Sequence, residues 1–347
     1  MKNFKKNRKK LNIVVMFVLC VFMITSLTAC KKGFWEQFLL NNKTGDSDIE
    51  TTAQSEPDND TKESVTTKDE DEIDTDSSVY KDSNGDKAYI PKNFTVSTNK
   101  DEKTINTGLV VKGPDDSEFV WIPTTVTKLS VRDFESYFSS SDSISNYYDE
   151  TDLDEYKDMV DSTKKYGGFY IGRYEASKGD NGLPASKRVS SSNPGQIWVQ
   201  YSPQDTTTTC KKLYADNDTV QGFFPWGINW DTVLQWIVDS GNKELSDIKN
   251  NSSSWGNYSN DTFSDGARGN YTGVWEEAKA CNIYDLAGNN WEWTQERSGS
   301  NYVMRGGGYN LMGGSCPGNL YPAAIRDPLP GNNHHPNVTF RVALYLK

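Results

Sequence analysis

The sequence is poor in the residues on which several common chemistries depend. Only two of its 347 residues are histidines and only five are cysteines. The histidines, His334 and His335, are adjacent, so their side chains point in different directions and are poor partners for one metal ion. We interpret them as exposed loop residues. No basic stripe follows the first residues, which argues against nucleic acid as a partner.

Positive charge is also scarce over a long acidic segment, which accounts for most of the net charge of −11. Between residues 46 and 86, Asp and Glu far outnumber Lys, and aromatic residues are almost absent. Such a segment cannot bury enough surface to offset the loss of chain entropy. We expect residues 30–103 to be the lipidated cysteine and a disordered acidic tether, a solvated spacer and not an acidic binding site.

The first 29 residues have the pattern of a bacterial export signal. Several Lys and Arg residues precede the apolar run from Leu11 to Leu27, and small residues precede Cys30. The ending Leu27-Thr28-Ala29-Cys30 resembles a lipobox, which implies cleavage before Cys30 and lipid attachment to it. An uncleaved single-span anchor is the alternative, because about 17 apolar residues are at the low end for a span. We expect a protein that is lipid-anchored at the bacterial cell surface.

The cysteines after the export segment are Cys210, Cys281 and Cys316. Three is an odd number, so at most one disulfide can form among them and one thiol is left over. A location outside the cytoplasm permits a bridge, but the sequence does not choose the pair.

Residues 104–347 have the patterns of one compact α+β domain with few helices and short strands. Strands are predicted at 109–113, 118–123 and 169–175. Ser202 and Asp231 have the features of helix N-caps. The segment from Ser130 to Lys165 has the composition of an acidic insert with short helices. We expect a monomer.

The stretch from Asn282 to Thr294 combines apolar residues, turn formers, two indoles and two carboxylates. A solvated loop would not carry Trp291 and Trp293, and a regular strand would not carry Gly-Asn-Asn in its middle. The pattern predicts a short strand, a tight Gly-Asn turn and a second strand whose tryptophans enter the core.

Several short motifs occur in an order that resembles the formylglycine-generating enzyme family, also called sulfatase-modifying factor domains. They are Phe-Tyr-Ile-Gly-Arg-Tyr-Glu (169–175), Phe-Pro-Trp-Gly (224–227), Asn-Ile-Tyr-Asp-Leu-Ala-Gly-Asn-Asn-Trp-Glu-Trp (282–293), Arg-Gly-Gly-Gly (305–308) and Phe-Arg-Val-Ala (340–343). The resemblance implies an α+β fold similar to a C-type lectin, with little regular secondary structure.

The residues for the family's chemistry are not found at the matching positions. Enzymes of this family oxidise a cysteine of a sulfatase with a copper-binding pair of cysteines five residues apart, the second lying three residues before an arginine. If Arg326 matches that arginine, the pair falls at Gly318 and Ala323. Cys316 is alone, and one thiol can neither form a two-coordinate copper site nor cycle through a disulfide. We therefore expect a non-catalytic protein, with a copper-dependent oxidase of this type as the alternative.

The resemblance also implies a structural calcium ion. Asp285 and Glu292 would supply carboxylate oxygens, and Gly288 and Asn290 would supply main-chain carbonyls. Hard oxygen ligands around a sharp glycine turn suit Ca²⁺. The alternative is that the two carboxylates cap turn amides without a metal.

The last loops form the exposed face in C-type-lectin-like folds, and here they hold many Asn, Tyr and His residues. The candidate ligand-binding residues are Tyr309, Asn310, Asn319, Tyr321, Asn332, Asn333, His334 and His335. Such side chains make adaptable contacts at low entropic cost, so we expect them to bind an extracellular protein or glycan. An ordinary polar surface loop is the alternative. The composition also fits, loosely, a target of a diversity-generating retroelement.

Overall fold

The computed structural model describes residues 77–129, 134–258, 269–311, 314–332 and 334–347. The chain divides into two units, and all of these residues lie in the second, Asp71–Lys347. The predicted signal peptide, Cys30 and the tether up to residue 76 lie outside the described residues. Within the described ranges, no helix has the length and apolar character needed to cross a membrane.

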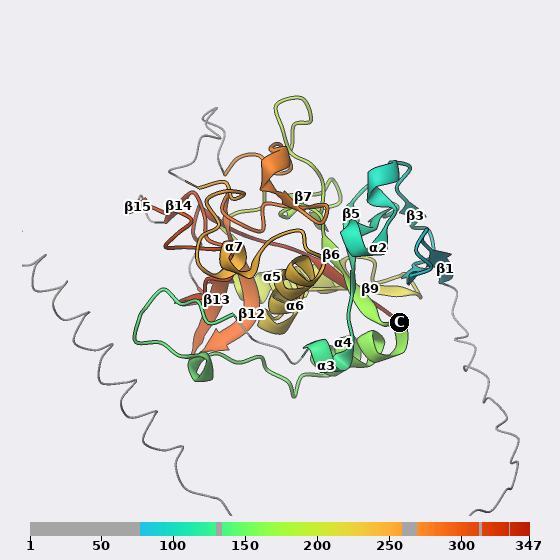
Figure 1. Ribbon diagram of the computed structural model, residues 1–347. Helices are drawn as coiled ribbons and strands as arrows, with labels where there is room; N and C mark the ends of the chain where they lie inside the picture. The colour runs from blue at the N-terminus through green and yellow to red at the C-terminus, as the bar shows by residue number, and fades with distance from the viewer. Residues whose placement is uncertain (1–76, 130–133, 259–268, 312–313, 333) are drawn as a thin grey trace, which may run out of the picture. The chain divides into compact units, whose positions relative to one another are not determined.

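The larger sheet has the strand order β3-β4-β5-β6-β18-β9, and its strands β3, β5, β6 and β9 are labelled in Figure 1. Its strands are β3 (Thr95–Val96), β4 (Val110–Lys112), β5 (Glu118–Pro123), β6 (Gly168–Gly172), β18 (Ala343–Leu346) and β9 (Val220–Phe223). All neighbours are antiparallel. Every residue of β6 and of β18 is buried, because these central strands are covered on both faces. The end of the chain thus completes the core.

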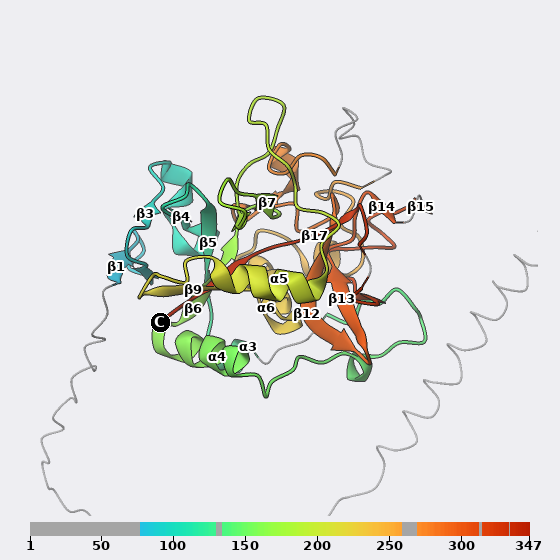
Figure 2. The ribbon, with the colours of Figure 1, turned by 180° about the vertical axis from the view of Figure 1, so that it is seen from behind.

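The smaller sheet has the order β16-β13-β12-β17 (Figure 2). Its strands are β12 (Trp291–Ser298), β13 (Asn301–Arg305), β16 (Asp327–Leu329) and β17 (Val338–Phe340). β12 pairs antiparallel with β13 and parallel with β17. The short two-stranded pairs are β1 (Ser78–Lys81) with β2 (Lys87–Ile90), β7 (Ser177–Lys178) with β8 (Pro184–Ala185), β10 (Lys279–Ala280) with β11 (Ile283–Tyr284), and β14 (Asn310–Leu311) with β15 (Gly314–Ser315).

The helices pack against both sheets. They are α2 (Ile105–Gly108), α3 (Val126–Leu129), α4 (Asp154–Tyr166), α5 (Pro203–Lys212), α6 (Gly227–Asp239) and α7 (Leu245–Lys249), and the 3₁₀ turns are η1 (Lys100–Glu102), η2 (Ile144–Asn146) and η3 (Glu276–Ala278). α4 contacts β6 and β18, whereas α5 and α6 each contact β12. The chain therefore has the α+β class that the sequence predicts.

The start of α6 differs from the prediction. Ser202 caps α5 as expected, because its hydroxyl accepts a hydrogen bond from the Asp205 amide. Asp231, in contrast, is not the cap of α6 but lies inside it, because the helix begins at Gly227. Asp149 caps this helix from far away in the sequence: its carboxylate accepts from the Gly227 and Ile228 amides, each at 3.0 Å.

The domain also begins earlier than residue 104, where the sequence analysis placed its start. β1, β2 and β3 all precede that residue, and β3 is part of the larger sheet. Ala88, Ile90 and Phe94 are buried in the core. The surrounding charged residues favoured a disordered tether over residues 77–103, but these apolar side chains bury enough surface for the segment to fold. The folded part therefore includes residues 77–103.

The strand, turn and strand predicted around the two indoles are confirmed. β11 leads into the turn and β12 out of it, with Trp291 and Trp293 buried. Gly288 has φ +76°, and a Cβ there would lie 2.4 Å from the Asn257 carbonyl oxygen. Only glycine fits this turn without strain.

Candidate ligand-binding site

A cavity of about 540 Å³ lies between three segments that are far apart in the sequence. We call it the loop pocket. Its lining residues are Glu135, Ser136, Tyr137, Phe138, Ser139, Ser140, Asp142, Lys249, Asn250, Asn319, Leu320, Tyr321 and Pro322. Of the predicted ligand-binding residues, it brings together Asn319 and Tyr321.

The loop pocket has exposed apolar edges. Phe138 is 55 % exposed and Leu320 is 61 % exposed. The Phe138 ring stacks on Tyr321, with centroids 6.0 Å apart, and Tyr321 in turn meets the edge of Trp291 at 5.6 Å. Large apolar side chains left open around a concavity are typical of binding surfaces.

One wall of the loop pocket, residues 134–138, is fixed to the backbone of Arg326. The Arg326 amide donates to the Ser136 carbonyl at 3.0 Å, and the Phe138 amide donates to the Arg326 carbonyl at 3.1 Å. The Arg326 guanidinium also donates to the Phe134 carbonyl. The wall is therefore held by backbone hydrogen bonds on both sides of Tyr137.

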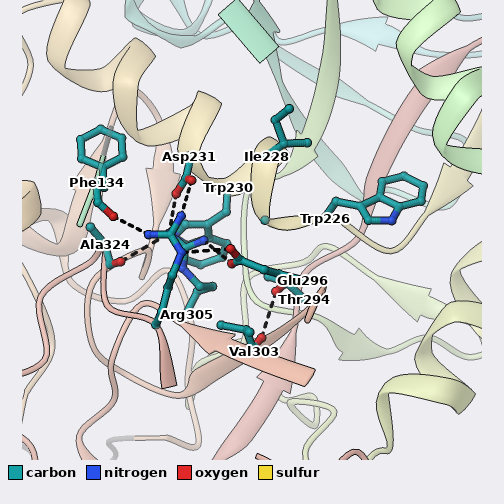
Figure 3. A network of polar contacts seen from close by, with 12 residues as sticks. Phe134, Trp226, Ile228, Trp230, Asp231, Thr294, Glu296, Val303, Arg305 and Ala324 are labelled. Carbon is teal, nitrogen blue, oxygen red and sulfur yellow. Dashed lines mark hydrogen bonds and ion pairs between the residues drawn. The ribbon is translucent and has the colours of Figure 1, made fainter. Parts of the chain in front are cut away.

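Asp231, Glu296 and Arg305 form a buried ion network (Figure 3), and Arg326 is its fourth member. Arg305 donates to Asp231 at 2.5 Å and to Glu296 at 2.9 Å. Arg326 donates to Glu296 at 2.9 Å and also to Asp231. All four side chains have no exposed surface. Two cations and two anions make the network neutral, which is the condition for burying charge at all.

The network joins α6, β12, β13 and the segment before β16. Burial on its own would lower the pKa of Arg326, but the adjacent Asp231 and Glu296 carboxylates raise that pKa above its usual value. Arg326 thus stays charged while it holds the pocket wall. The buried ion network and the pocket wall are therefore connected directly through Arg326.

The rim of the loop pocket is charged. Glu135, Asp142 and Lys249 all line it, and Asp142 also accepts a hydrogen bond from the Tyr147 hydroxyl at 3.1 Å. Behind the lining, burial and the nearby Asp142 raise the pKa of Asp327 to about 7. In the described part of the lining, two carboxylates thus stand against one basic group.

Most of the other predicted ligand-binding residues lie elsewhere. Tyr309 donates through its hydroxyl to Asn337 at 2.9 Å. His334 contacts the Gln200 carbonyl at 2.9 Å, and the His335 carbonyl accepts from the Gln200 amide at 3.1 Å. Asn310 is in β14, Asn332 is exposed, and Asn333 lies outside the described residues. Tyr309, Asn310, Asn332, His334 and His335 do not line the loop pocket.

The part of the site that comes from residues 134–142 and from Lys249 and Asn250 was not predicted from the sequence. The first of these segments has the composition of an acidic insert of low specificity. One signal was available: Tyr137 and Phe138 are adjacent aromatics among Ser and Asp residues, a composition that a plain spacer does not need.

The predicted calcium ligands meet different partners. Both oxygens of Glu292 are bound by Arg341, at 3.0 and 2.5 Å. Asp285 Oδ2 accepts from the Thr272 hydroxyl at 2.8 Å and from the Gly273 amide at 2.9 Å. The second of these contacts is the turn-capping role of the alternative interpretation. Glu292 is therefore already paired with one cation, the Arg341 guanidinium.

Two features of the same region fit a cation in part. Asp285 Oδ1 and Asn290 Oδ1 are buried and have no hydrogen-bond partner. Burial, Asp285 and Glu292 raise the pKa of Glu175, which accepts hydrogen bonds from Asn290. In the described ranges, however, no group of three or more His, Cys, Asp or Glu residues is arranged to hold a metal ion. Calcium at this turn stays a prediction.

The positions matched to the family's cysteine pair are closed. A Cβ at Gly318 would lie 2.6 Å from the Ser253 amide nitrogen, so a cysteine there would need a backbone shift. Ala323 has no exposed surface. Cys316 is 1 % exposed, and burial raises its pKa to about 11. Of the cysteines that the structure describes, Cys210, Cys281 and Cys316, no two form a disulfide.

No protein-family model matches the chain, and no curated protein matches it. Among solved structures, PvdO from Pseudomonas aeruginosa is similar at 13 % identity, with a TM-score of 0.42 over 68 % of this chain and 98 % of that chain. Treponema denticola variable protein 1 is similar at 12 % identity, with a TM-score of 0.25 over 78 % of this chain and 99 % of that chain. At these values the likenesses carry no argument about function.

Proposed function

We propose that this chain is a non-catalytic binding protein that displays its folded domain outside a bacterial membrane. Cys30 would carry the lipid anchor, and the acidic segment after it would hold the domain away from the membrane. The domain would bind an external protein or glycan through the loop pocket. A structural calcium ion at the Asp285 turn is part of this proposal.

The observation that carries the proposal is the loop pocket itself. A fixed wall faces loop residues 319–322, and the apolar side chains of Phe138 and Leu320 stand open at its edge. A protein gains nothing in stability from leaving such groups exposed, whereas a bound ligand would cover them.

The enzyme alternative has less support. Oxidation of a cysteine by the family's chemistry requires an accessible thiolate, because the thiolate is both the nucleophile and the metal ligand. Cys316 is buried and has a raised pKa. Copper-dependent oxidation of a sulfatase-motif peptide by the full-length chain, abolished in Cys316→Ser, would contradict the proposal.

Binding can be tested with the full-length chain in detergent on a glycan microarray and on an array of extracellular proteins. Phe138→Ser and Asn319→Ala should lose the binding. Asn332→Ala and Leu153→Ser are the matched controls, because both residues are exposed and neither lines the loop pocket. Binding that survives Phe138→Ser and Asn319→Ala would place the site elsewhere.

The anchor and the diversified loops need separate tests. Labelling with an alkyne-tagged fatty acid in a bacterial host should mark the wild-type chain and not Cys30→Ser. For the loops, a near-copy of the 3′ coding end that differs only at adenines, beside a reverse transcriptase gene, would support a retroelement target. A neighbouring sulfatase gene would instead favour the enzyme.

A further inference from the structure

We propose that the occupant of the loop pocket is a protein segment that carries a basic side chain next to an aliphatic or aromatic one, and not a glycan. This inference rests on the proposed function and specifies the ligand of the same site. It follows from the exposed apolar groups, the charge of the rim and the rigidity of the wall.

The apolar part of the argument concerns Leu320. It is the most exposed large apolar side chain among the described residues, at 61 %. A sugar ring can lie on the face of Phe138, but it would have to leave the aliphatic Leu320 uncovered or bury hydroxyl groups against it. A hydroxyl that is buried without a hydrogen bond costs free energy. A Leu, Met or Phe side chain of a protein would bury both groups at once.

The charge of the rim selects the second side chain. Glu135 and Asp142 line the pocket, and Lys249 is the only basic residue among the lining residues that the structure describes. The rings of Tyr137, Phe138 and Tyr321 line the same pocket as these carboxylates. Carboxylates next to aromatic faces attract a guanidinium or an ammonium group through charge and through cation–π contact. An acidic segment would be repelled.

The fixed wall favours a measurable affinity for a ligand even though the pocket is open to solvent. Residues 134–138 are pinned to Arg326, which the buried network holds in place. Ordering a loop on binding costs free energy that must be subtracted from the affinity. Here the wall carrying Glu135 and Phe138 is ordered before the ligand arrives.

The probe is an array of peptides in a Gly-Ser frame, each with one Arg or Lys placed one to four residues from a Leu or Phe. A matched set has Glu in place of the basic residue, and a glycan microarray is read in parallel with the same full-length chain in detergent. We expect binding to the basic apolar peptides, weakened at 0.5 M NaCl because exposed charges are screened, and no binding to the Glu set.

Variants locate the binding. Leu320→Ser should weaken it at least about tenfold, as for a truncated hot-spot side chain. Glu135→Gln should weaken it about threefold, as for one exposed charge pair. Leu153→Ser and Glu277→Gln are the matched controls, because each is exposed and outside the lining, and neither should change the affinity.

Three outcomes would overturn the inference: equal binding to the Glu set, no peptide binding at millimolar concentration, or peptide binding that Leu320→Ser and Glu135→Gln leave unchanged. The glycan arm separates this failure from failure of the proposed function. Glycan binding that is lost in Leu320→Ser would overturn the basic-peptide ligand and keep the loop pocket as the binding site. No pocket-dependent binding on any array would contradict both.

Discussion

Arg326→Met removes one cation from the buried ion network and leaves two carboxylates to share Arg305. Asp231 and Glu296 each accept from both arginines, and none of the four side chains has exposed surface. Water cannot replace the lost donors, so one negative charge remains buried and uncompensated. Breaking a buried pair in this way costs about 3–5 kcal/mol.

A loss of that size is large enough to measure by thermal unfolding. In a domain of about 150–250 residues, each kcal/mol of lost stability lowers the melting temperature by about 2–4 °C. The melting temperature of Arg326→Met should therefore fall by on the order of 10 °C. Intrinsic tryptophan fluorescence is a suitable probe, since the chain has ten tryptophans, most of those in the domain being buried. Urea unfolding should show the same loss at an unchanged slope.

Two further variants make this prediction specific. Lys128→Met is the control, because Lys128 pairs with Asp239 at 3.3 Å on the surface, with side chains 62 % and 43 % exposed. Such a pair contributes less than about 1 kcal/mol. The double variant Glu296→Gln with Arg326→Met restores neutrality, so its cost should be below the sum of the single costs. If Arg326→Met were as mild as Lys128→Met, the account of the network would be wrong.

Four other predictions follow from single observations. Burial and the nearby Asp142 raise the pKa of Asp327 to about 7, so the folded state holds this proton more tightly than the unfolded state does. The free energy of unfolding should therefore fall as the pH rises from about 4 to 7. This prediction would be contradicted if the wild-type protein lost no more stability over this pH range than Asp327→Asn does. Trp293→Ala should cost about 3–5 kcal/mol in urea unfolding, because the side chain is 1 % exposed; an unchanged melting temperature would refute its core role. Cys210, Cys281 and Cys316 should react with a thiol reagent at pH 8 only after denaturation, since all three are buried and form no disulfide with one another; fast native labelling would count against that. Millimolar CaCl₂ should raise the melting temperature relative to EDTA if the unpartnered Asp285 oxygen takes a cation, and equal values would remove calcium from the proposal.

Local signals were enough to predict some of the regular elements and the buried turn around the two indoles. Trp291 and Trp293 are too apolar for a solvated loop, and Gly288 marks the turn before them. Ser202, followed by Pro203, sets the start of α5 by capping it: its hydroxyl accepts a hydrogen bond from the amide of Asp205, only three residues away. In each case the residues that decide the structure are neighbours in the sequence.

Contacts between distant residues decided the rest. Asp149 sets the start of α6 from 78 residues away, which left Asp231 free to join the ion network. Arg341 takes the Glu292 carboxylate across 49 residues, so a ligand assignment from the turn alone could not account for it. The loop pocket depends on the hydrogen bonds between Arg326 and residues 134–138. The sequence of the acidic insert alone does not indicate that it pairs with Arg326.

The most direct test of the central claim is the affinity of the full-length chain for its best array ligand, compared between wild type, Leu320→Ser and Leu153→Ser. Both variants replace an exposed leucine, and only Leu320 lines the loop pocket. The account predicts a loss of at least about tenfold for Leu320→Ser and no change for Leu153→Ser. Equal affinities of all three proteins would contradict it.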